Sequence, residues 1–151
     1  METASIRSAR VSALSHATED KTKVVEAMTK VVAKSFSGDF HSARMKGHYG
    51  NEILLLKIVS SSPREAEVFL KQLWKRLLAY DREMILSATE NSMDQSGTLF
   101  LRVDKGQALH GNVRIGSVDT IRVELQFSPD KDNKGEIVRT VQKTLSTIST
   151  P

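Results

Sequence analysis

The 151-residue sequence contains no cysteine, and this absence excludes disulfide bridges, thiolate zinc sites and cysteine nucleophiles. Aromatic residues make up only 5% of the chain, which argues against a surface built mainly for stacking nucleobases. The apolar runs, of which residues 53–56 are an example, are far too short to cross a bilayer. The N-terminal residues include Arg7 and Arg10 but no continuous apolar segment, so we expect no signal peptide, no membrane partner and a cytoplasmic location.

The composition that remains is that of an ordinary globular protein. Hydrophobic residues make up 39% and charged residues 26%, so we expect a folded, soluble chain, with residues 1–151 as a single domain. The formal net charge of +4 favours polyanions as partners without establishing one. The glycines are not followed by the lysine–serine pair of a phosphate-binding loop, and we expect no cofactor.

Residues 98–127 predict three consecutive short strands. At both ends of this stretch apolar side chains alternate with polar ones, as in a strand with two different faces. The alternating apolar residues are Leu99, Leu101, Val103, Ile121, Val123, Leu125 and Phe127. Residues 108–115 between them are less regular but compatible with a strand, and Gly106 and Gly116 mark the breaks. This pattern predicts an antiparallel meander with one apolar face that other elements must cover.

The remaining patterns supply that cover. In chain order they predict a strand (6–15), a helix (21–34), a strand (36–45), a turn (46–51), a central strand buried on both sides (52–60), a helix (63–78), a short helix (81–90) and a C-terminal helix (134–148). We expect caps at Thr18 or Asp20, at Ser62 and at Asn133. The fold class is therefore α+β: a two-layer, mostly antiparallel sheet with helices on one face, in the order β-α-β-β-α-(α)-β-β-β-α.

Three stretches together resemble a known family. They are HATED at residues 16–20, GHYGN at 47–51, and LRVDK at 101–105 with Ala108 and the later DTIRV at 119–123. In this order and spacing they resemble the archaeal RNA-binding proteins described as predicted exosome subunits. The resemblance implies a fold like that of the large-subunit ribosomal protein that binds 5S RNA, and a role in RNA binding within an RNA-processing complex.

The sequence departs from the family pattern at two places. Tyr49 stands where the family turn has a second histidine. Gly106 separates Lys105 from Gln107, and the family's following tyrosine is absent, leaving Leu109 and His110. A contact that this glutamine and tyrosine make to RNA would therefore be altered in this chain.

Two groups of residues are candidates for contacting RNA. In the turn, Lys46 and His48 are suited to phosphates and Tyr49 to stacking on a base, with Asn51 beside them. Turns with two glycines and an asparagine are also common for purely structural reasons. In the meander, the candidates are Arg102, Lys105, Gln107 and Arg114. An ordinary solvated face of mixed charge is the alternative for these residues.

We expect a non-catalytic RNA-binding protein and no metal site. The four histidines, His16, His41, His48 and His110, lack ligand spacing, and Asp104 and Asp119 have no third carboxylate at a telling distance. A small hydrolase is therefore a distant alternative. A scaffold or oligomerisation domain, including a homodimer that pairs through an exposed strand edge, is the main alternative to RNA binding.

Overall fold

The structure is a computed structural model that describes residues 4–38, 40–47, 49–128 and 133–148. Its strands are β1 (Ser5–Ser15), β2 (His41–Lys46), β3 (Glu52–Ser60), β4 (Thr98–Asp104) and β5 (Thr120–Ser128). Its helices are α1 (Lys21–Val32), α2 (Pro63–Arg76), α3 (Ala79–Ala88), α4 (Lys105–Leu109) and α5 (Lys134–Ser146). None of the described helices combines the length and apolarity that a membrane crossing needs.

The strands form one antiparallel sheet in the order β2-β3-β1-β5-β4. The first strand of the chain is therefore the middle strand of the sheet. As its alternating pattern predicts, β1 buries Ala9, Val11 and Ala13 on one face and turns Arg10 and Leu14 to the other. This confirms the predicted α+β class.

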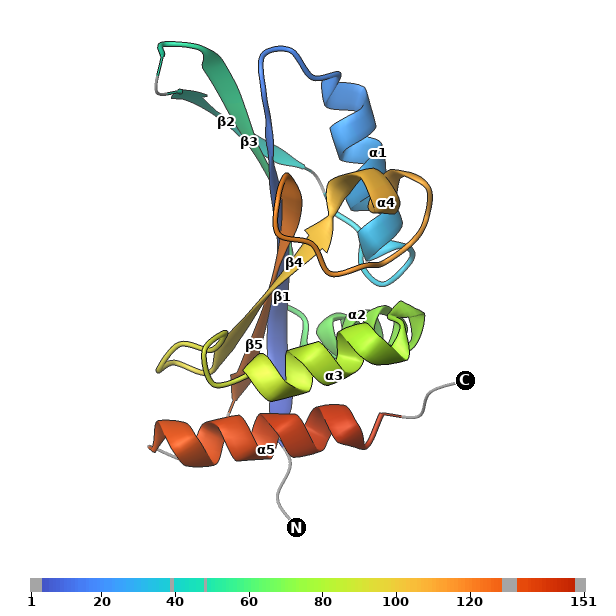
Figure 1. Ribbon diagram of the computed structural model, residues 1–151, viewed down its shortest axis with the longest axis vertical. Helices are drawn as coiled ribbons and strands as arrows, with labels where there is room; N and C mark the ends of the chain where they lie inside the picture. The colour runs from blue at the N-terminus through green and yellow to red at the C-terminus, as the bar shows by residue number, and fades with distance from the viewer. Residues whose placement is uncertain (1–3, 39, 48, 129–132, 149–151) are drawn as a thin grey trace.

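The helices cover a single face of the sheet. Helices α1, α2, α3 and α4 lie on one side of the strands, and α5 lies across the end where β1 begins (Figure 1). There the Ala4 N–H donates to Thr144 Oγ1 at 2.8 Å. The buried strand residues Leu99, Val123 and Leu125 face these helices. The face that the helices leave uncovered is called the open face.

The predicted helix caps are confirmed. The Asp20 carboxylate accepts from Thr22 N at 2.9 Å, and Ser62 Oγ accepts from Glu65 N at 3.3 Å. Asn133 Oδ1 accepts from the first-turn N–H groups of α5. These side chains satisfy backbone donors that have no partner inside the helix. Local sequence signals therefore fix where these three helices begin.

The strand predicted at residues 108–115 is wrong. Asp104 Oδ1 accepts from Gln107 N at 2.8 Å and caps α4, which takes the place of a β-turn. The chain then loops back and touches β4 through a single bridge between Val103 and Ile115. Gly116 permits this approach because a Cβ there would lie 3.1 Å from the Asp104 Cα. The meander is thus two strands with a helix and loop between them.

Strand β3 is not buried on both sides, so that prediction is also wrong. Leu56 and Ile58 are buried against the helices, but Val59 is 36% exposed and Leu55 is only half-buried. The physical reason is that helices cover one face of this sheet only. The strand predicted over residues 36–45 is shorter than expected: β2 begins at His41, and Phe36 packs edge-on to Phe69 in the core.

Candidate nucleic-acid interface

A row of mostly basic side chains crosses the open face from one edge strand to the other. The pairing places His41 opposite Lys57, Lys57 opposite Ser12, Ser12 opposite Arg122, and Arg122 opposite Arg102. Directly paired residues on neighbouring strands point to the same face of a sheet. Each of the five strands therefore contributes one residue, and four of the five are basic or histidine. We call these five residues the basic row.

The charges of the basic row are not neutralised by nearby carboxylates. Within the described part of the chain, neither the Lys57 side chain nor the Arg102 side chain has a hydrogen-bond or ion-pair partner. The Arg122 guanidinium lies over the Phe100 ring, 4.6 Å from its centroid. In the neighbouring row, Arg10 forms a 3.9 Å ion pair with Glu124. The open face thus keeps a surplus of positive charge that is available to an anionic ligand.

The hairpin of β2 and β3 extends this face beyond the helices (Figure 1). At its tip Gly47 N donates to Asn51 O at 2.6 Å, and Gly50 takes the positive φ of 80° that glycine adopts without strain. Lys46, Tyr49 and Asn51 are all exposed, Tyr49 to 87%. The structure brings these three predicted residues together on one tip. The predicted contact His48 lies outside the described residues.

Lys105 is placed differently from the other predicted contacts. Its side chain is buried, and its Nζ donates to Leu14 O at 2.9 Å and to both Glu19 carboxylate oxygens at 3.2 Å. A further ion pair joins Nζ to Asp119 Oδ1 at 2.7 Å. The ammonium therefore contacts four oxygen atoms from three residues and is turned away from solvent. This geometry fits a structural role for Lys105.

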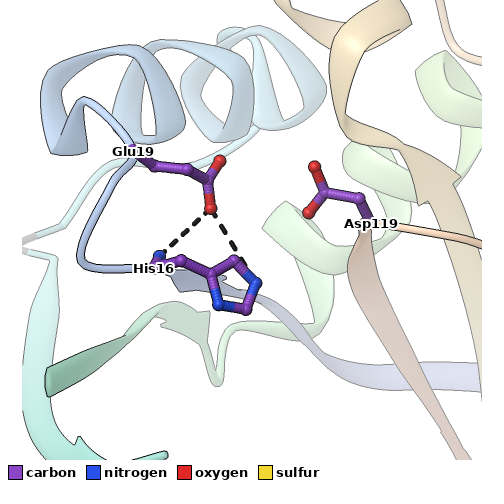
Figure 2. Close-up of side chains that lie close together, drawn as sticks. All are labelled: His16, Glu19 and Asp119. Atoms are coloured by element: carbon purple, nitrogen blue, oxygen red, sulfur yellow. Dashed lines mark hydrogen bonds and ion pairs between the residues drawn. The ribbon is translucent and has the colours of Figure 1, made fainter. Parts of the chain in front are cut away.

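The same corner holds a cluster that has the donor atoms of a metal site. His16, Glu19 and Asp119 converge (Figure 2), with one ligand atom from each lying within 4.8 Å of the others. Between the two carboxylates lies the Lys105 ammonium, which already supplies the positive charge that they require. A metal ion would compete with this ammonium for the same oxygens. The arrangement is that of a charge-balanced ion-pair network.

Gln107 and Arg114 lie together, but away from the basic row. Arg114 Nε donates to Asp81 Oδ2 at 3.0 Å, and Gln107 Oε1 accepts from Asn112 Nδ2 at 3.2 Å. Both line a hollow of about 340 Å³ beside α4. Helix α4 lies on the side of the sheet that the helices cover (Figure 1). Of the four candidates predicted in the meander, Arg102 alone belongs to the basic row.

One known protein family matches the stretch of chain that carries this geometry. The profile of a family described as RNA binding matches residues 8–127, which run from within β1 to the last but one residue of β5 and so contain nearly all of the sheet. The chain belongs to this RNA-binding family. It is 29% identical over 140 residues to the RNA-binding protein PAB1135 of Pyrococcus abyssi, covering 90% of this chain and 91% of that protein.

Solved structures share the fold of this member of the RNA-binding family. Protein AF2318 from Archaeoglobus fulgidus matches with a TM-score of 0.83 and 31% identity, covering 92% of this chain and 99% of that one. Mth689 from Methanothermobacter thermautotrophicus matches with a TM-score of 0.74 and 24% identity over 93% of this chain and 98% of that one. The second likeness concerns the fold alone.

Sequence reasoning missed most of the basic row of this RNA-binding family member. Lys57 is the single charged residue of β3 after Glu52 at its start, and Arg122 alternates with the buried residues of β5. These positions are visible in the sequence as charges on the outward face of a strand. Their alignment across the sheet depends on the register of four strand pairings, for which the sequence contains no local signal.

Proposed function

We propose that this protein binds RNA, without performing chemistry on it, through the open face of its sheet and the tip of the β2–β3 hairpin. The observation that carries the proposal is the basic row. With neighbouring strands about 4.8 Å apart, its five positions span about 19 Å, which is enough to contact several phosphates of one nucleic-acid strand. Membership of the RNA-binding family supports RNA as the polyanion.

The composition of the open face favours contacts to the phosphate backbone. Phe100 carries the only phenyl ring among the open-face positions of the five described strands, and Arg122 covers one side of it. Lysine and arginine contacts to phosphates fix position and orientation without reading the base sequence. The sheet therefore suits binding that depends on RNA shape and charge.

The proposal of a role without catalysis is supported by how the nearest carboxylates are engaged. Glu124 pairs with Arg10, and the Asp104 carboxylate caps α4. Neither is left to act as a base or to bind a catalytic metal ion. The resemblance to predicted exosome subunits supports an accessory role in RNA processing or degradation, as a partner within a cytoplasmic RNA-processing complex.

The proposal is tested by removing two charges from the basic row. We expect Lys57→Gln with Arg102→Gln to weaken RNA binding and to reduce the log–log dependence of affinity on salt by about 0.7–0.9 for each phosphate that the variant no longer neutralises. The measurement is fluorescence anisotropy of labelled single-stranded and hairpin RNA at several salt concentrations. The control is Lys23→Gln with Lys75→Gln, which removes the same charge from exposed positions on α1 and α2. Equal losses of affinity in both variants would contradict the proposed surface.

Self-association through β2 is a second candidate function, favoured by the difference between the two edges of the sheet. Strand β4 is covered by backbone hydrogen bonds from Phe100 N to Ser92 O and from Asp104 N to Arg114 O. Strand β2 pairs with β3 alone, and all six of its residues are exposed. An open edge of this kind can pair with a second copy of the chain. A homodimer would be detected by analytical ultracentrifugation and would dissociate with Ala43→Lys.

A further inference from the structure

A cavity of about 650 Å³ lies at the β4 edge of the sheet and is lined both by open-face residues of β4 and β5 and by residues of helix α3. Met93 and Ile115 form apolar walls, and Ala88 of α3 closes one side. Phe100, Arg102 and Arg122 line it from the strands, so the end of the basic row also lines the cavity. Its volume falls within the range of about 300–1,000 Å³ that is typical of small-ligand sites.

The two arginines of this cavity are placed as an anion-binding pair. Arg102 and Arg122 are directly opposite each other on β4 and β5, an arrangement in which like charges repel. No carboxylate among the described residues forms an ion pair with either guanidinium. The Asp94 carboxylate, which lines the same cavity, accepts hydrogen bonds from Ser96 of its own loop and from Thr98 at the start of β4. A bound phosphate would relieve the repulsion and accept hydrogen bonds from both guanidiniums.

The rest of the cavity has the chemistry that a nucleobase requires. The Phe100 ring and the Arg122 plane offer flat surfaces for stacking, and Met93 and Ile115 offer apolar contact. Asn91 and Ser92 supply polar groups for the edge of a base. The lining thus includes charged groups suited to a phosphate, flat groups suited to a base face and polar groups suited to a base edge.

We infer that this cavity holds one unpaired nucleotide of an RNA that lies on the open face, with its phosphate bound by Arg102 and Arg122. The inference rests on the proposed function and deepens it, because it names the class of RNA preferred. A base that is already unpaired enters such a cavity without the cost of breaking a base pair. The protein therefore prefers RNA with a bulge, loop or single-stranded end over a perfect duplex.

The test compares two RNA duplexes of the same sequence, one of which carries a single bulged nucleotide. Wild-type protein is expected to bind the bulged duplex about tenfold more tightly, the effect of one stacked base. Ala88→Leu fills the cavity and is expected to abolish this preference while leaving affinity for the perfect duplex unchanged. Ala79→Leu, the same change at an exposed position of α3, is expected to keep the preference.

The outcomes separate this inference from the proposed function. Two outcomes would overturn the assignment of the cavity as a nucleotide site and leave the proposal of RNA binding intact. One is equal affinity of the wild-type protein for the two duplexes, and the other is a bulge preference that survives Ala88→Leu. Absence of binding to every RNA at low salt overturns both. Adenosine monophosphate and the perfect duplex can each be added as a competitor of the bulged RNA. If adenosine monophosphate displaces the bulged RNA at a lower concentration than the perfect duplex needs, the cavity is assigned to a free nucleotide and the inference is overturned.

A second measurement uses wild-type protein and so does not depend on the folding of a variant. A 4-thiouridine placed at the bulge is irradiated in the complex, and the crosslinked peptide is identified by mass spectrometry. Crosslinks are expected within residues 84–102, the segment that supplies most of the cavity lining. Crosslinks confined to the β2–β3 hairpin would overturn the inference.

Discussion

Lys105 Nζ lies 2.7 Å from Asp119 Oδ1, and this ion pair ties the first residue of α4 to the loop that leads into β5. The same ammonium reaches Glu19, just before α1, and the Leu14 carbonyl of β1. The stretch from Leu14 to Glu19 therefore meets Lys105 and Asp119, which are far from it in the sequence, at one buried charge. Its loss would leave two carboxylates facing each other without a cation.

We predict that Lys105→Met lowers the free energy of unfolding by about 1.5–3 kcal/mol, the range for hydrogen bonds to charged groups. RNA affinity of the folded variant should stay within about twofold of wild type, a change of less than 0.5 kcal/mol. Urea denaturation and RNA anisotropy measure the two quantities. Lys23→Met, at an exposed position of α1, is the matched control and should leave stability nearly unchanged. A stable Lys105→Met variant with weak RNA binding would show that Lys105 contacts RNA after all.

The elements predicted well are those with local signals. Ser62 and Asn133 lie at helix starts that their side chains cap, and Val11 lies in a strand whose alternation identifies its buried face. Residues 108–115 show where such signals compete. Asp104 and Gln107 have the spacing of a helix start, but the adjacent glycine favours interpretation as a hairpin turn.

The candidate site was only partly predictable because it is built by long-range pairing. The pattern of its own strand identifies Arg102, whereas Lys57 and Arg122 gain significance only when β3, β1, β5 and β4 are aligned. Lys105 shows the converse. Its charge indicates an exposed residue, but tertiary contacts with Glu19 and Asp119 bury it.

Because of Asp94, we expect the stability of the fold to depend on pH in the acid range. Burial on its own raises the pKa of this carboxyl, but hydrogen bonds from Thr98, Ser96 and Gly97 outweigh burial and hold the pKa below its ordinary value. Between the folded and the unfolded pKa the unfolded chain binds more protons, so stability falls as the pH drops below about 4. Thermal melting from about pH 7 to about pH 3 should show this loss. Asp94→Asn should flatten it, whereas Glu90→Gln on the exposed surface should not.

We predict that substitution of Asp81 lowers the stability of the fold without directly changing the basic row. Its buried carboxylate accepts from Arg114 Nε at 3.0 Å and from Ile115 N at 3.1 Å. Asp81→Ala removes Oδ2, which accepts both hydrogen bonds, and should destabilise the fold by about 1–3 kcal/mol in urea denaturation. Asp81→Asn keeps one carbonyl oxygen and should cost less. A larger loss of stability in the asparagine variant would contradict this assignment of the hydrogen bonds.

We predict that the aromatic ring of Tyr49, at the tip of the hairpin, contributes to RNA binding. The side chain is 87% exposed, so Tyr49→Ala should leave thermal stability unchanged. If the ring stacks on a base, the variant should bind single-stranded RNA more weakly by about 1–3 kcal/mol in anisotropy titrations. Tyr49→Phe keeps the ring and should bind like wild type, and affinity for a blunt duplex should be the same for all three proteins. An equal loss of affinity in the phenylalanine and alanine variants would instead assign the contact to the hydroxyl group.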